Sequence, residues 1–147
     1  MKGVEPITDP SGVDSLLDLV RYKGPVNRDL EKRVESLLDV PDGFTRWEVQ
    51  FKQRNEPVRQ YWFFDLKGHG FEPNEELVYG ALFVTFITRD GERRVEFEAI
   101  GTNGDDYEPY ENSTGVGDVS QLRLWIDKTI EYAKRSQFRR ERSAGTE

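Results

Sequence analysis

The one histidine of the chain, His69, is the side chain best suited to proton transfer near neutral pH, because imidazole titrates in that range. It stands between Gly68 and Gly70. Catalysis by such a base needs a nucleophile or an electrophile beside it, and a zinc site needs three or four nitrogen or sulfur ligands. No Ser or second His forms a motif with it, and the chain has no Cys. The sequence therefore predicts that His69 is a solvated loop residue and that the protein is not an enzyme.

An acidic segment, residues 103–117, is the second place where chemistry is conceivable, because carboxylate oxygens are ligands that Ca²⁺ prefers. Its spacing does not match a calcium-binding EF-hand loop: Asn103, Asp105 and Tyr107 occupy the first three alternating ligand positions, and no glycine follows Tyr107. The segment contains no Lys or Arg, and two tyrosines stand among its carboxylates. We therefore predict no metal there, but a contact surface for a protein partner. The residues of this predicted partner-binding site are Asp105, Asp106, Tyr107, Glu108, Tyr110 and Glu111.

Two glycines at the end of this segment, Gly115 and Gly117, precede a predicted helix, as glycines do in phosphate-binding loops. A third glycine is missing, since Ser120 stands at its position, and no lysine follows as a phosphate loop requires. Asp118 would moreover place a negative charge where the phosphate should lie. Nor do the 28 acidic residues include a pair whose context indicates one raised and one ordinary pKa. We therefore expect no catalytic residues and no cofactor.

The composition predicts a single acidic domain. The chain has 147 residues, of which 35% are hydrophobic and 12% aromatic, enough for one sizeable core. Its formal net charge is −7, so that on average it repels nucleic acid and anionic membranes and attracts basic partners. The absence of cysteine and of a long apolar run predicts a cytoplasmic protein without a membrane span. We expect one domain over residues 1–147, with loose termini at 1–8 and 143–147.

The strongest structural pattern is a hairpin over residues 77–102, whose two strands flank the pair Asp90-Gly91. An Asp-Gly pair favours the tight turns of hairpins, because those turns need a positive φ. Apolar residues stand on both sides of the period-two pattern in the first strand, which predicts a central strand buried on both faces. Two earlier strands are predicted at 44–52 and 58–66, and 103–117 is predicted to be a loop.

Three helices are predicted around this sheet. The first follows the entry Asp9-Pro10-Ser11 and is ended by Gly24, and the second begins at Asn27 and is stopped by Pro41. The last begins at Asp118 and lies across the sheet with an apolar stripe that contains Trp125, Ile126 and Ile130. The predicted fold is thus α+β: a four-stranded antiparallel sheet (meander) with two N-terminal helices and one C-terminal helix packed on it.

The order of these elements resembles that of the Rad52-like single-strand annealing proteins. The likeness rests on Gly43-Phe44 and Trp47 at the entry into the first strand, on the hairpin 77–102, and on Ala133-Lys134-Arg135 in the last helix. It covers about two-thirds of the chain and includes no specific motif. The resemblance implies a nucleic-acid-binding module. Basic candidates for such contacts are Arg93, Arg94, Arg139 and Arg140.

The function predicted from these observations is that of a non-enzymatic interaction module. It would regulate or inhibit a larger basic protein that handles nucleic acid, such as a nuclease or a polymerase. Direct binding of nucleic acid is the first alternative, which the acidic residues of 103–118 oppose. The second alternative is a small-ligand binder or enzyme with a pocket between sheet and helix, lined by the aromatic residues of 61–64.

Overall fold

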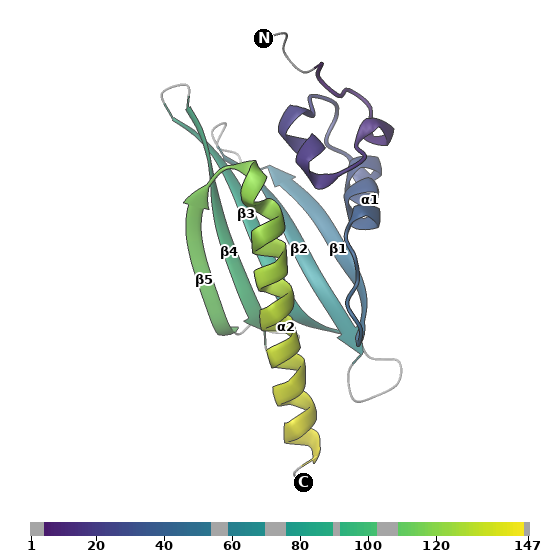
Figure 1. Cartoon of the computed structure of the whole chain (residues 1–147), viewed down its shortest axis with the longest axis vertical. Helices are drawn as coiled ribbons and strands as arrows, with labels where there is room; N and C mark the ends of the chain where they lie inside the picture. The colour runs from purple at the N-terminus through teal and green to yellow at the C-terminus, as the bar shows by residue number, and fades with distance from the viewer. Residues whose placement is uncertain (1–4, 54–58, 70–75, 90–91, 103–108, 146–147) are drawn as a thin grey trace.

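The computed structural model describes residues 5–53, 59–69, 76–89, 92–102 and 109–145. Its centre is one antiparallel sheet, in which each strand pairs with the next along the chain in the order β1-β2-β3-β4-β5 (Figure 1). The predicted fold class, α+β with an antiparallel meander, is confirmed. The strands are β1 (Phe44–Gln53), β2 (Arg59–His69), β3 (Glu76–Arg89), β4 (Glu92–Thr102) and β5 (Pro109–Gly117).

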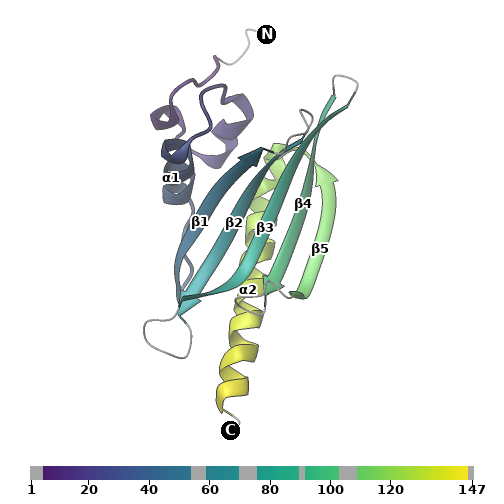
Figure 2. The same ribbon diagram turned by 180° about the vertical axis from the view of Figure 1, so that it is seen from behind.

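The described helices lie on one face of the sheet. Helix α2 (Leu122–Gly145) runs over β3 and β4, and helix α1 (Arg28–Leu37) packs against β1 (Figure 1). Short 3-10 turns come before each helix, namely η1 (Pro10–Gly12) and η2 (Leu16–Arg21) before α1, and η4 (Val119–Gln121) before α2. Seen from behind, the opposite face of the sheet is covered by none of these helices (Figure 2). We call it the bare face.

The sheet has one strand more than predicted, because 109–117 forms β5 and is not a loop. Strand β5 pairs with β4, with Ser113 opposite Ala99 and Gly115 opposite Phe97. The segment lacks the apolar alternation of a strand because Trp125 of α2 lies directly over it. A Cβ atom at Gly115 would stand 2.5 Å from the Trp125 ring. Small residues are therefore required under the helix, and their presence made the segment resemble a loop in sequence.

The first predicted helix is also different, since η1 and η2 take its place. Asp9 caps η1 as expected, accepting a hydrogen bond from the Ser11 amide at 2.9 Å. Gly12 disfavours a helical backbone on entropic grounds, and Ser15 then starts a new cap that closes on Asp18. Two short turns are therefore favoured over one continuous helix.

The other two helix starts are confirmed. Helix α1 begins after Asn27, whose side chain accepts a hydrogen bond from the Leu30 amide at 3.2 Å. It ends at Leu37, a few residues before the predicted stop at Pro41. The last helical stretch begins after Asp118 as predicted, since Asp118 and Gln121 form a capping box around η4, which leads into α2 at Leu122.

Helix α1 protects the outer edge of β1. An edge strand exposes unpaired backbone groups that invite other chains to pair with it. Here Glu35 accepts a hydrogen bond from the Val49 amide at 2.9 Å, and Glu31 accepts one from the Phe51 amide at 2.6 Å. Arg28 donates to the Val49 carbonyl oxygen at 3.1 Å. Side chains of α1 thus form hydrogen bonds with backbone groups of β1 to which a further strand would otherwise bind.

A bulge in β3 interrupts the alternation of its side chains between the two faces of the sheet. Between Val78 and Gly80 the pairing with β2 skips Tyr79. As a result, Leu77 and Tyr79 share the helix-covered core with Leu82, and Val78 does not. An unbroken period of two would place Val78 on the side of Leu82, and the bulge changes this because it adds one residue to β3.

The close approach of α2 to the sheet requires glycine at position 101. A Cβ atom at Gly101 would stand 2.7 Å from the Ser136 hydroxyl and 2.9 Å from the Tyr132 carbonyl oxygen. We expect Gly101→Val to lower the free energy of unfolding by about 1–3 kcal/mol, because the helix backbone must move away. Urea unfolding measures the change. The control Thr114→Val, at an exposed strand position, should stay within about 0.5 kcal/mol of wild type. Wild-type stability in Gly101→Val would show that the helix is not packed this closely.

Candidate functional site

The bare face has an apolar centre. Val84 of β3 and Phe97 of β4 point into the helix-covered core. Because side chains alternate along a strand, the residues next to them in sequence point to the bare face. Phe63 of β2 and Phe83 of β3 are opposite each other there, with ring centroids 4.7 Å apart. Both residues are half-buried, although none of the described helices lies above them (Figure 2). The centre of the face is therefore an aromatic pair accessible from solvent.

A shallow depression of about 370 Å³ adjoins this pair, and we call it the β3–β5 depression. Glu96 is exposed and Glu98 is half-buried. Within the described ranges, neither carboxylate forms an ion pair or a hydrogen bond. Val116, from β5, is 63% exposed. The side chains of this face that line the depression are Phe83, Thr85, Glu96, Glu98, Thr114 and Val116.

At the β1 side of the bare face, in contrast, the carboxylate of Glu48 already has hydrogen-bond and ion-pair partners. The Lys67 ammonium donates a hydrogen bond to Glu48 at 2.6 Å, and the Gln50 amide donates another at 3.0 Å. Arg46 approaches the same carboxylate to 4.0 Å. The hydrogen bond from Lys67 is the main cause that lowers the pKa of Glu48 below its ordinary value, and partial burial opposes it. The charge of Glu48 is therefore already offset by cations, unlike the charges of Glu96 and Glu98.

The lowered pKa of Glu48 predicts a pH dependence of stability. The stabilisation from this group is complete above its unfolded pKa of about 4.5 and is lost as the pH falls through the folded value. We expect Lys67→Met to lower the free energy of unfolding by about 1 kcal/mol at pH 7, with little difference left near pH 3. Urea unfolding of both proteins at the two pH values measures this. A difference that is equal at both, or larger in acid, would contradict the pairing.

The predicted acidic site is described only at its end. Asp105, Asp106, Tyr107 and Glu108 lie outside the described residues, and Tyr110 belongs to β5 with its side chain also outside them. Glu111 is described, and both of its carboxylate oxygens accept hydrogen bonds from Arg135 of α2, at 3.1 and 3.0 Å. Arg135 also pairs with Glu131. The sequence could not show that Glu111 has a counter-ion, because Arg135 comes 24 residues later.

The other candidate residues fall at three separate places. His69 is not in a loop but is the last residue of β2, opposite Glu76 of β3. Arg93 and Arg94 belong to β4, and Arg94 is exposed. Arg139 and Arg140 belong to the last turns of α2. The backbone thus distributes the basic candidates between a strand and a distant helix end.

The aromatic residues of 61–64 divide between the two faces. Trp62 lines a pocket on the helix-covered side, as the predicted sheet–helix pocket requires, and Phe64 is buried in the core. Phe63 lies on the bare face, and the side chain of Tyr61 is outside the described residues. The pocket has a volume of about 670 Å³ and lies where η2, the sheet and η4 meet.

The described residues and the comparisons add three findings. No three His, Asp or Glu side chains in the described ranges gather as metal ligands would. No helix in those ranges is both long enough and apolar enough to cross a membrane. The likeness to the Rad52-like proteins rests on element order alone, and comparisons with family models, curated proteins and solved structures found no match to this chain.

Proposed function

We propose that this protein is a non-enzymatic interaction module that docks a basic segment of a larger protein on its bare sheet face. One observation carries the proposal. Glu96 and Glu98 stand without ion pairs in the described part of the chain, beside the accessible ring of Phe83, on a face that the described helices leave uncovered.

The chemistry of the β3–β5 depression suits a lysine or arginine side chain. Glu96 and Glu98 are two positions apart on one strand, so their Cα atoms are about 7 Å apart on the same face. Their mutual repulsion is relieved when a cation comes between them. The alkyl stem of Lys or Arg can meanwhile cover Phe83 and Val116, and the charged group can contact the ring face.

The overall charge supports the same kind of partner. A chain with a net charge of −7 attracts a basic protein over a distance and speeds its association. Proteins that handle nucleic acid have basic surfaces for phosphate, and an acidic module that occupies such a surface regulates or inhibits its owner. The acidic segment 105–108 stands in the sequence between β4 and β5, two of the three strands that line the β3–β5 depression, and we propose it as a second part of the contact.

Direct nucleic-acid binding by this face is disfavoured by the same residues. Phosphate groups would meet the carboxylates of Glu96 and Glu98, and no cation lines the β3–β5 depression in the part of the chain that the structure describes. The basic candidates at the end of α2 belong to another element.

A pull-down from the extract of the native host tests the proposal. Wild-type protein is compared as bait with the double variant Glu96→Gln/Glu98→Gln. The control is Asp39→Asn/Asp42→Asn, which removes the same charge from two exposed residues between α1 and β1. We expect a basic protein to be retained by wild type and control and lost by the double variant. Retention by all three would place the interface elsewhere, and retention of nucleic acid alone would favour the alternative.

A further inference from the structure

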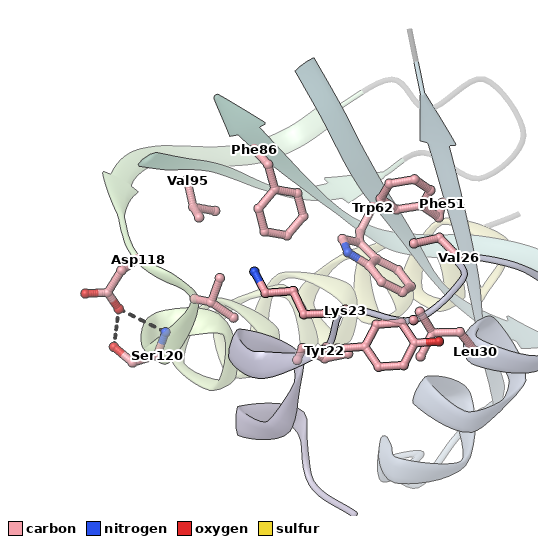
Figure 3. A pocket seen from close by; sticks show the side chains of 13 residues that line it. Tyr22, Lys23, Val26, Leu30, Phe51, Trp62, Phe86, Val95, Asp118 and Ser120 are labelled. Atoms are coloured by element: carbon pink, nitrogen blue, oxygen red, sulfur yellow. Dashed lines mark hydrogen bonds between the residues drawn. The ribbon is translucent and has the colours of Figure 1, made fainter. Parts of the chain in front are cut away.

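The pocket on the helix-covered side is a gap between the N-terminal turns and the start of α2 (Figure 3). Its floor is the sheet, where β2, β3 and β4 contribute Trp62, Phe86 and Val95. These three residues are at most 9% exposed, so the floor is deep and apolar. The volume of about 670 Å³ is in the range of sites for small organic molecules. Its walls come from Leu19, Tyr22, Gly24 and Val26 on one side and from Val119 and Ser120 on the other.

The one lysine of the pocket points inward. In Figure 3 the Lys23 ammonium extends from the N-terminal segment over the floor, toward Phe86 and Val95. This ammonium forms no ion pair with any residue that the structure describes. Exposed lysines such as Lys32 and Lys134 also form no ion pair in the described ranges, so what distinguishes Lys23 is its place over an apolar floor. The position therefore favours an anionic group in the pocket.

The other polar side chains of the pocket are already engaged. The Asp118 carboxylate accepts hydrogen bonds from the Ser120 amide at 2.9 Å and from the Ser120 hydroxyl, and in Figure 3 it points away from the floor. The Tyr22 hydroxyl donates to the Pro25 carbonyl oxygen at 2.6 Å. Burial, helped by the charge of Asp9, raises the pKa of Tyr22, so the phenol stays neutral. Lys23 is thus the charged group that remains for a ligand.

We propose that this pocket binds a small organic anion with a flat apolar body. The body lies against Trp62 and Phe86, and the anionic group pairs with Lys23 at the mouth. Lys23 is exposed, and the apolar floor excludes water from one side of the pair, which strengthens it relative to a pair on an open surface. The site is separate from the bare face, since it lies on the opposite side of the sheet, and its existence does not depend on the proposed protein partner.

Anilinonaphthalene sulfonate is a suitable probe, because it is a flat apolar anion whose fluorescence rises in an apolar site. We expect saturable binding to the folded wild-type chain. Lys23→Met keeps the apolar stem and should weaken binding roughly tenfold. The control Lys32→Met, at an exposed position on α1, should change the affinity less than about twofold. Val26→Trp fills the mouth from a residue that is 43% exposed and should abolish binding without unfolding the protein.

The neutral analogue phenylnaphthylamine separates the charge from the apolar contact. We expect it to bind more weakly and to be unaffected by Lys23→Met. Melting curves of each variant confirm that the probe reports on folded protein. Three results would overturn the proposal: no saturable binding, binding that survives Val26→Trp, or equal affinity of the sulfonate for wild type and Lys23→Met. The last would indicate an apolar occupant, such as a protein side chain, in place of an anion.

Discussion

Replacing Trp125 by alanine is expected to lower the free energy of unfolding by about 3–5 kcal/mol, the range for the loss of a large core side chain. Trp125 is only 9% exposed and joins three parts of the fold. Its ring stacks on Phe97 of β4, with centroids 5.3 Å apart and planes 5° from parallel. It also fills the space above Gly115 of β5, so alanine would leave a cavity between helix and sheet.

Urea unfolding of Trp125→Ala measures this cost. The control is Leu124→Ala, at the neighbouring position on the same helix. Leu124 is 60% exposed, so this variant should remain within about 0.5 kcal/mol of the wild-type free energy of unfolding. Equal losses in the two variants would mean that α2 does not bury its Trp125 side against the sheet.

The double variant Glu96→Gln/Glu98→Gln is expected to weaken binding of the basic partner by about tenfold or more. Glutamine keeps the size of the side chain and one acceptor oxygen, and it replaces the other oxygen by an NH2 donor, so the change removes the negative charge with little change in volume. The loss should arise mainly in the association rate, because attraction between opposite charges acts before contact. The salt dependence of association should become flatter for the same reason.

Binding kinetics at low and at physiological salt measure both effects. The control variant Asp39→Asn/Asp42→Asn has the same formal net charge, −7 + 2 = −5, but leaves the β3–β5 depression intact. A general effect of net charge would slow both variants equally. Such a result would argue that the partner is attracted by the whole molecule and that Glu96 and Glu98 form no specific contact.

The parts of the fold with strong local signals were predictable from sequence. The β3–β4 hairpin has an Asp-Gly pair between two apolar runs, and α2 has an apolar stripe and follows the capping box of η4, so local residues decide these elements. Strand β5 could not be predicted because its residue types depend on a side chain that is distant in sequence. Position 115 must be glycine because the Trp125 ring lies directly over it. The bulge at Tyr79 was missed because periodicity cannot show where a partner strand skips a residue.

The candidate sites depend even more on distant residues. In the sequence, Glu96 and Glu98 alternate with apolar residues, which predicts that both point to the same side of β4. The sequence does not show that the described helices leave this side uncovered. The sequence likewise does not show that Arg135 pairs with Glu111. This pair offsets part of the negative charge predicted for the acidic segment. The pocket around Lys23 is lined by residues from the N-terminal segment, from strands of the sheet and from η4. These segments are distant in sequence, so no local pattern predicts that they meet.

Photo-crosslinking from two matched positions tests the docking of a basic partner on the bare face most directly. A photoreactive residue replaces Val116, which is 63% exposed beside Glu96 and Glu98, or Leu124, which is 60% exposed on the helix side. We predict that position 116 captures a basic protein from the host extract, that position 124 does not, and that adding Glu96→Gln/Glu98→Gln abolishes the capture. Capture of the partner from position 124 and not from position 116 would contradict docking on the bare face.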